Sequence, residues 1–84
     1  MISEPSGADA AVTLARLRAD VASGRVREIR ERARLSQSEV AEGVGVERST
    51  VAQWEAGRMP RGDHAARYAA LLARLEATAR EKAP

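Results

Sequence analysis

Apolar side chains recur along most of the 84-residue chain at intervals of three and four, which is the period of an α-helix. Leu14, Leu17 and Val21 follow this spacing and predict a first helix over about residues 8–22. The same reading predicts four more helical segments, over about 25–34, from Gln37 to near Gly45, over 47–56 and over 64–82.

Short polar and glycine-containing segments predict where these helices begin and end. Ser36 and Glu39 have the spacing of a capping box, so we expect a helix to start directly after Ser36. Gly45 suits a tight bend that needs positive φ, and Asp63 is placed to cap the last helix. Residues 1–7 are predicted to be flexible, which leaves residues 8–82 as a single helical domain.

The composition supports an all-α fold with a thin core. Hydrophobic residues make up 44% of the chain, but 18 of these 37 residues are Ala, and Phe is absent. Close helix crossings built on Ala are therefore expected. Without Cys and with only one His, the chain lacks the usual ligands of a zinc site, and no apolar run has the length of a membrane span. We expect no metal and no cofactor.

The net charge of +2 is too small to indicate a partner, but its distribution is uneven. Residues 25–34 contain five Arg and two Glu, a local charge of +3. Arg25, Arg27, Arg32 and Arg34 are interpreted as a solvated helix face rather than as ligands of an anion.

The most informative segment is 37–56, where two short helices are predicted with a glycine between them. A small residue at the crossing and apolar residues along a shared seam are needed for such a pair. This requirement is met at seven positions: Val40, Ala41, Val44, Gly45, Val46, Val51 and Trp54. The seam could also be the ordinary core of a small helical bundle.

In these positions, and in Leu35–Gln37 before and Trp54–Gly57 after them, the chain resembles the helix-turn-helix family of the lambda repressor, Cro and xenobiotic-response-element (XRE) regulators. The resemblance covers about residues 25–75 and implies a lambda-repressor-like bundle with its recognition helix at 47–56. It also implies a cytoplasmic, nucleoid-associated regulator encoded by a bacterium or a phage. Residues 1–24 lie outside the pattern.

In such a motif the second helix lies in the major groove of duplex DNA. If Val51 and Trp54 point inward, the opposite face presents the candidate base-contacting residues Arg48, Ser49, Ala52 and Gln53. An Arg can fork onto guanine and a Gln can pair with adenine, while an Ala can contact a thymine methyl group.

Candidate phosphate contacts lie within this helix, at Thr50, and outside it, at Gln37, Arg58 and Arg61. The resemblance further implies a structural ion pair between Arg30 and Glu55. Glu47 and Ala56 depart from the family pattern, although Glu47 could cap the helix or accept a hydrogen bond from cytosine. Trp54 is expected in the core, and Tyr68 is expected to pack with its hydroxyl at the surface.

The leading hypothesis is a sequence-specific transcriptional repressor that binds a near-palindromic operator as a homodimer. Either the first or the last helix would supply the dimer contact. One alternative is an antitoxin that binds both DNA and a toxin, and another is a protein-interaction adaptor that has lost DNA binding. No nucleophile with its base and no phosphate-binding glycine loop is present in the sequence, so an enzyme is the weakest hypothesis.

Overall fold

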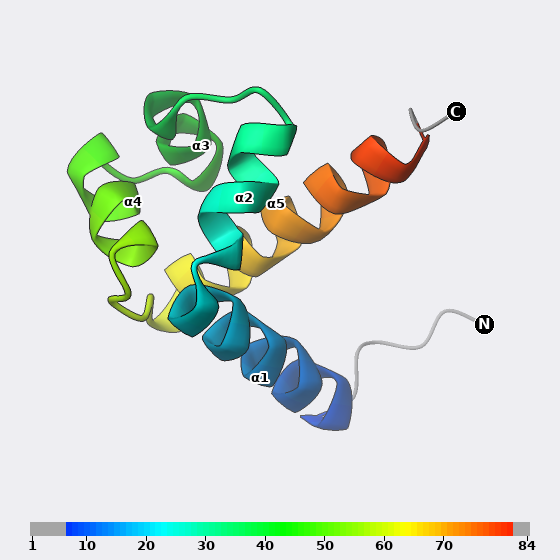
Figure 1. Cartoon of the computed structure of the whole chain (residues 1–84). Helices are drawn as coiled ribbons and strands as arrows, with labels where there is room; N and C mark the ends of the chain where they lie inside the picture. Colours follow the sequence, from blue (N-terminus) through cyan, green and yellow to red (C-terminus); the bar gives the residue numbers. More distant parts are fainter. Residues whose placement is uncertain (1–6, 82–84) are drawn as a thin grey trace.

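Five α-helices, and no strand, form within residues 7–81, the part of the chain that this computed structural model describes. They are α1 (Gly7–Ser23), α2 (Arg25–Arg32), α3 (Gln37–Val44), α4 (Arg48–Glu55) and α5 (Gly62–Glu81). The prediction of an all-α bundle of about five helices is therefore confirmed. The long α5 contacts α1, α2 and α3, and α3 packs closely on α4 (Figure 1).

The first two helices differ at their ends from the prediction. Helix α1 begins at Gly7 instead of residue 8, so the predicted flexible segment 1–7 was too long at this end, and the rest of it lies outside the described residues. Helix α2 stops at Arg32 instead of residue 34. Ala33 caps it, and the positive φ of 60° at Arg34 turns the chain out of the helix.

The last two helices also differ from their predicted limits. Helix α4 covers 48–55 and not 47–56, because the flanking Glu47 and Ala56 are its caps. Helix α5 begins at Gly62, so Asp63 lies inside the first turn and is not the N-cap, contrary to the prediction. Its predicted end at residue 82 lies outside the described residues.

The capping box before α3 is present. The Ser36 hydroxyl accepts a hydrogen bond of 3.0 Å from the backbone N–H of Glu39, and the Glu39 carboxylate accepts one of 2.8 Å from the backbone N–H of Ser36. At the other end, Gly45 adopts φ 86° and donates to the carbonyl of Ala41 over 2.8 Å. The turn therefore sets the direction in which the chain continues from α3 into α4.

The core is small and draws on all five helices. Two of its members, Trp54 and Tyr68, pack with ring centroids 4.6 Å apart. Tyr68 is only 1% exposed, so the expectation that its hydroxyl lies at the surface is wrong, and burial raises the pKa of this hydroxyl far above its usual range. The buried hydrophobic residues are Leu17, Val21, Val26, Ile29, Val40, Ala41, Val44, Val51, Trp54, Ala65, Tyr68 and Leu72.

Five of the seven seam residues belong to this core. The sixth, Val46, is partly buried and packs against it, and the seventh, Gly45, forms the turn. On α1, Leu17 and Val21 are buried as expected, but Leu14 stays 36% exposed. The apolar stripe of α1 is therefore wider than the surface that the other helices cover.

Candidate nucleic-acid interface

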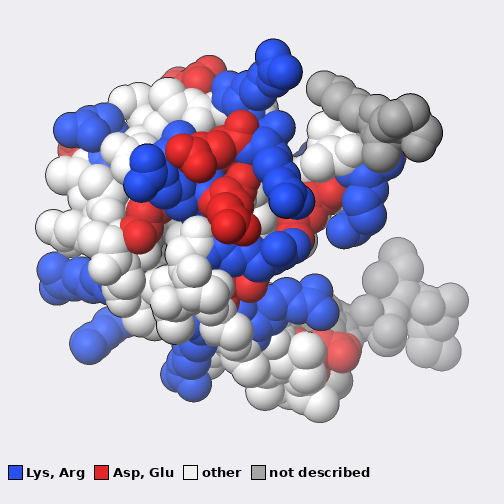
Figure 2. Space-filling view, in the orientation of Figure 1, with Lys and Arg blue, Asp and Glu red and all other residues white. Residues whose placement is uncertain are grey.

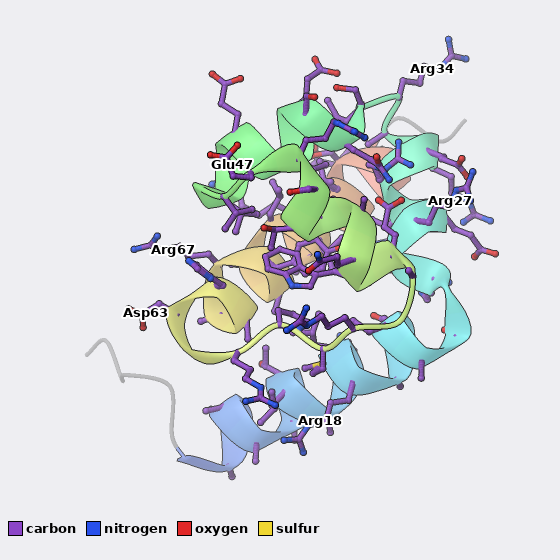
Figure 3. The ribbon with its side chains drawn as sticks, turned by 90° about the vertical axis from the view of Figure 1, so that its left-hand side faces the viewer. Arg18, Arg27, Arg34, Glu47, Asp63 and Arg67 are labelled. Carbon is purple, nitrogen blue, oxygen red and sulfur yellow. The ribbon has the colours of Figure 1, made fainter. Side chains whose placement is uncertain are left out.

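Helix α4 lies at the surface with one face buried and one face open (Figure 3). Val51 and Trp54 point into the core, which turns the opposite side of the helix outward. Of the candidate base-contacting residues, Arg48, Ser49 and Gln53 are exposed and Ala52 is half-buried.

A bidentate ion pair fixes the C-terminal end of α4 to α2. The Arg30 guanidinium donates to the Glu55 carboxylate through Nε at 2.5 Å and through Nη2 at 3.0 Å. Its Nη1 also donates to the backbone carbonyl of Leu35 over 2.9 Å. The Arg30 and Glu55 side chains are only 12% and 5% exposed. One guanidinium thus holds α2, the loop before α3, and α4 together.

The surroundings of Glu55 keep it ionised. Burial alone would raise the pKa of this carboxyl, but hydrogen bonds from Arg30 and Gln37, together with the charge of Arg30, lower it below its usual value. The hydrogen bond to Glu55 likewise raises the pKa of Arg30. Both partners are therefore charged at neutral pH, as a partly buried pair requires.

Gln37 connects this ion pair to the open face of α4. Its amide Nε2 donates to Glu55 over 3.1 Å, and its Oε1 accepts from Nη1 of Arg48 over 3.0 Å. The predicted phosphate ligand Gln37 and the predicted base ligand Arg48 thus form one chain of hydrogen bonds that ends at the ion pair.

A second hydrogen bond between a predicted phosphate ligand and a predicted base ligand lies near the C-terminal end of α4. Arg58, in the loop after the helix, donates from Nη1 to Oε1 of Gln53 over 3.2 Å. Of the other predicted phosphate ligands, Thr50 is half-buried in the first turn of α4 and Arg61 is exposed directly before α5. Apart from Arg61, the predicted DNA-contacting residues thus lie on α4 or are hydrogen-bonded to it.

Glu47 does not cap α4 through its side chain. It is the N-cap residue by its extended backbone, but its carboxylate makes no cap hydrogen bond, so a capping role for the side chain is wrong. The residue is exposed at the edge of the α4 face (Figure 3).

Arg67 is a charged residue near α4 that the sequence did not indicate. Arg67 of α5 places Nη1 3.7 Å from the point where a Cβ on Gly45 would lie, and so lies beside the α3–α4 turn. No local motif indicates this, since the two residues are far apart in the chain. In Figure 2, most of the charged side chains along the edge formed by α4 and the start of α5 are basic, whereas acidic and basic side chains alternate over α2.

A family model described as "Helix-turn-helix" (HTH_3) matches residues 26–76, which is more than half of the chain. The chain belongs to this helix-turn-helix family. The family is one of DNA-binding regulators of the XRE type and not an enzyme family. No curated protein and no solved structure matches the chain.

The helix-turn-helix match begins at Val26, so it takes in α2 to α5 and leaves out α1. Within the described residues, no group of acidic, His or Cys side chains has the arrangement of a metal site. None of the helices in this part of the chain is both long and apolar enough to span a membrane.

Proposed function

We propose that this helix-turn-helix protein is a transcriptional repressor that binds a near-palindromic operator in duplex DNA as a homodimer. The observation that carries the proposal is the open face of α4, held rigidly through Glu55, with Arg48, Ser49 and Gln53 exposed on it. Such a helix fits the major groove, where base edges present a distinct pattern of donors and acceptors.

Arg48 is proposed to contact guanine. A guanidinium has five N–H donors, and the contact to Gln37 uses one of them. The others remain free to fork onto O6 and N7 of the base. Gln37 keeps one amide N–H for a phosphate oxygen, because its amide has two and Glu55 takes the other.

Gln53 is proposed to contact adenine, with Ser49 and Ala52 contacting the neighbouring base pairs. Arg58 and Arg61 lie next to this helix in the chain and are proposed to bind the flanking phosphates, with Thr50 as a further phosphate ligand. Because Arg58 also donates to Gln53, we expect it to affect base preference as well as general affinity.

Selection of bound sequences from a random duplex library tests the proposal. We expect an enriched near-palindrome with half-site centres about 34 Å apart, one helical turn. Arg48→Ala should relax the preference at one position of each half-site and weaken specific binding by about 1–3 kcal/mol.

Arg27→Ala is the matched control, since Arg27 is exposed on α2 and pairs with Glu31 of the same helix. It should leave the selected sequence unchanged. A library that yields no enriched sequence would overturn the proposal in favour of a protein-interaction adaptor. Equal losses for Arg48→Ala on specific and random DNA would overturn the base contact.

A further inference from the structure

The surface beside α1 contains a groove with a volume of about 970 Å³. It lies between the N-terminal two thirds of α1, the loop from Met59 to Arg61, and the first half of α5. The family match covers the loop and α5 sides of this groove but leaves out α1, which forms its remaining side.

The groove is lined by small side chains, and large apolar side chains that could fill such a groove are exposed on the neighbouring α1. On the α5 side its lining is almost entirely alanine, at Ala65, Ala66, Ala69, Ala70 and Ala73. Alanine side chains end at Cβ and leave room for larger residues from elsewhere. Among the described residues, the exposed large hydrophobic side chains are Val12 and Leu14, 61% and 36% exposed, and both are on α1. Leu14 itself lines the groove.

We propose that this groove is filled by α1 of a second copy of the chain, in a two-fold symmetric dimer. A two-fold interface requires a self-complementary surface, because each copy must present both the projecting and the receiving element. The groove with Leu14 at its edge is such a surface. Each copy would insert Leu14 against the alanines of the other.

The charges along the groove favour an antiparallel pairing of the two α1 helices. Asp9 and Arg18 both line the groove, and they lie about 14 Å apart along α1 at 1.5 Å per residue. A two-fold axis midway between them passes between Thr13 and Leu14, which also line the groove. This axis places Asp9 opposite the partner's Arg18, and the same attraction occurs a second time by symmetry.

The position of the groove also suits two copies on one DNA duplex, a step that rests on the proposed function. In Figure 3, α1 and the α4–α5 loop form the lower edge of the face on which α4 lies. A second copy docked there extends that face. The two α4 helices of such a dimer would then serve the two half-sites of a near-palindromic operator.

Sedimentation equilibrium of the full chain without DNA, from micromolar to millimolar concentration, tests the dimer independently of any operator. We expect the apparent mass to rise from 9.0 kDa toward twice that value. Leu14→Lys should keep the chain monomeric. Ala19→Lys adds the same charge at an exposed position of α1 that does not line the groove, and should dimerise like the wild type.

A charge swap tests the antiparallel register. Arg18→Asp should weaken the dimer at least tenfold, and Asp9→Arg combined with Arg18→Asp should restore most of the loss. Far-UV circular dichroism and Trp54 fluorescence establish that each variant is folded.

A wild-type chain that stays monomeric throughout, or a dimer that survives Leu14→Lys, would overturn the inference. Selection of a palindrome that Leu14→Lys still binds with wild-type affinity would overturn the inference and leave the proposed function intact. A dimer sensitive to Leu14→Lys that enriches no DNA sequence would support the inference and overturn the proposed function.

Discussion

Glu55 organises several side chains around α4, although its own side chain is only 5% exposed. It accepts two hydrogen bonds from Arg30 and one from Gln37, and Gln37 in turn accepts one from Arg48. A long exposed Arg loses much rotamer freedom when it binds a base. The chain of hydrogen bonds from Glu55 restricts Arg48, which would lower the cost of the base contact that we propose for it.

The ion pair predicts a pH-dependent stability difference between the wild type and Arg30→Ala. At pH 7 the variant should lose about 3 kcal/mol in the free energy of unfolding, because it leaves a buried carboxylate without its cationic partner. In the wild type the pKa of Glu55 is lowered, so this stabilisation is present above its usual value of 4.5 and is lost as the pH falls through the folded pKa. The difference should therefore shrink below pH 4.5.

Urea unfolding followed by Trp54 fluorescence, at pH 7 and pH 3, measures both effects. Arg27→Ala is the control, because its exposed pair with Glu31 should contribute no more than about 0.5 kcal/mol. A loss for Arg30→Ala of equal size at the two pH values would show that packing, and not charge, causes it.

At the scale of elements, the decisive feature is the turn between α3 and α4. The capping box starts α3 at Gln37, and Gly45 ends the helix with φ 86°. Only three residues, Gly45 to Glu47, separate the two helices. The conformation of this turn therefore sets the crossing of the helices, and the face of α4 that remains open depends on it.

Gly45→Ala should destabilise the protein by about 1–2 kcal/mol, because an L-residue with a Cβ disfavours the left-handed conformation. A Cβ there would lie 3.7 Å from the nearest atom, Nη1 of Arg67, so the loss is conformational and not steric. Gly45→Asn should lose less, since Asn tolerates this conformation better. Urea unfolding of the wild type, Gly45→Ala and Gly45→Asn measures the order of their free energies of unfolding.

Gly43→Ala is the matched control in the same helix. Its φ is not positive, and its Cβ would contact Leu71 at 3.4 Å, so we expect no loss and a gain of up to about 1 kcal/mol from helix propensity. Equal losses at both glycines would refute the conformational explanation for Gly45.

At the scale of the whole molecule, the placement of charge matters more than its sum. The net charge is +2, yet Arg48 lies on α4 and Arg58 lies shortly after it, while the charge of Glu55 is balanced by Arg30. Arg25 pairs instead with Glu76 of α5 over 2.7 Å, away from α4. The α4 face is therefore the part of the surface best suited to a phosphate backbone.

The affinity for the selected operator should fall steeply with salt, because each neutralised phosphate contributes about −0.9 to the slope of log affinity on log salt. Arg58→Ala should flatten this slope by about one unit and also relax the preference at the base that we propose as the partner of Gln53. Arg80→Ala removes the same charge near the far end of α5, and its slope should match the wild type. Titrations of the operator with the wild type, Arg58→Ala and Arg80→Ala at several salt concentrations measure the three slopes. Equal slopes for both variants would place Arg58 away from the phosphates.

Much of the architecture follows from local patterns in the chain. Helical periodicity, the Ser36–Glu39 capping box and a glycine with positive φ act over a few residues, so the sequence predicts five helices and the α3–α4 turn. The prediction was less accurate at helix ends. There, single residues can leave the helical conformation, as Glu47 does with an extended backbone and Arg34 with a positive φ, and contacts from elsewhere decide where this happens.

Contacts between distant residues could not be predicted in the same way. The sequence marks Gln37, Arg48, Gln53 and Arg58 only as separate candidates, and their hydrogen-bonded pairs arise because α3, α4 and the following loop converge in space. The exposure of Leu14 and the groove beside α1 likewise depend on where α1 crosses α5. Periodicity identifies which face of a helix is apolar, but the area of that face that is covered depends on the angle at which the helices pack.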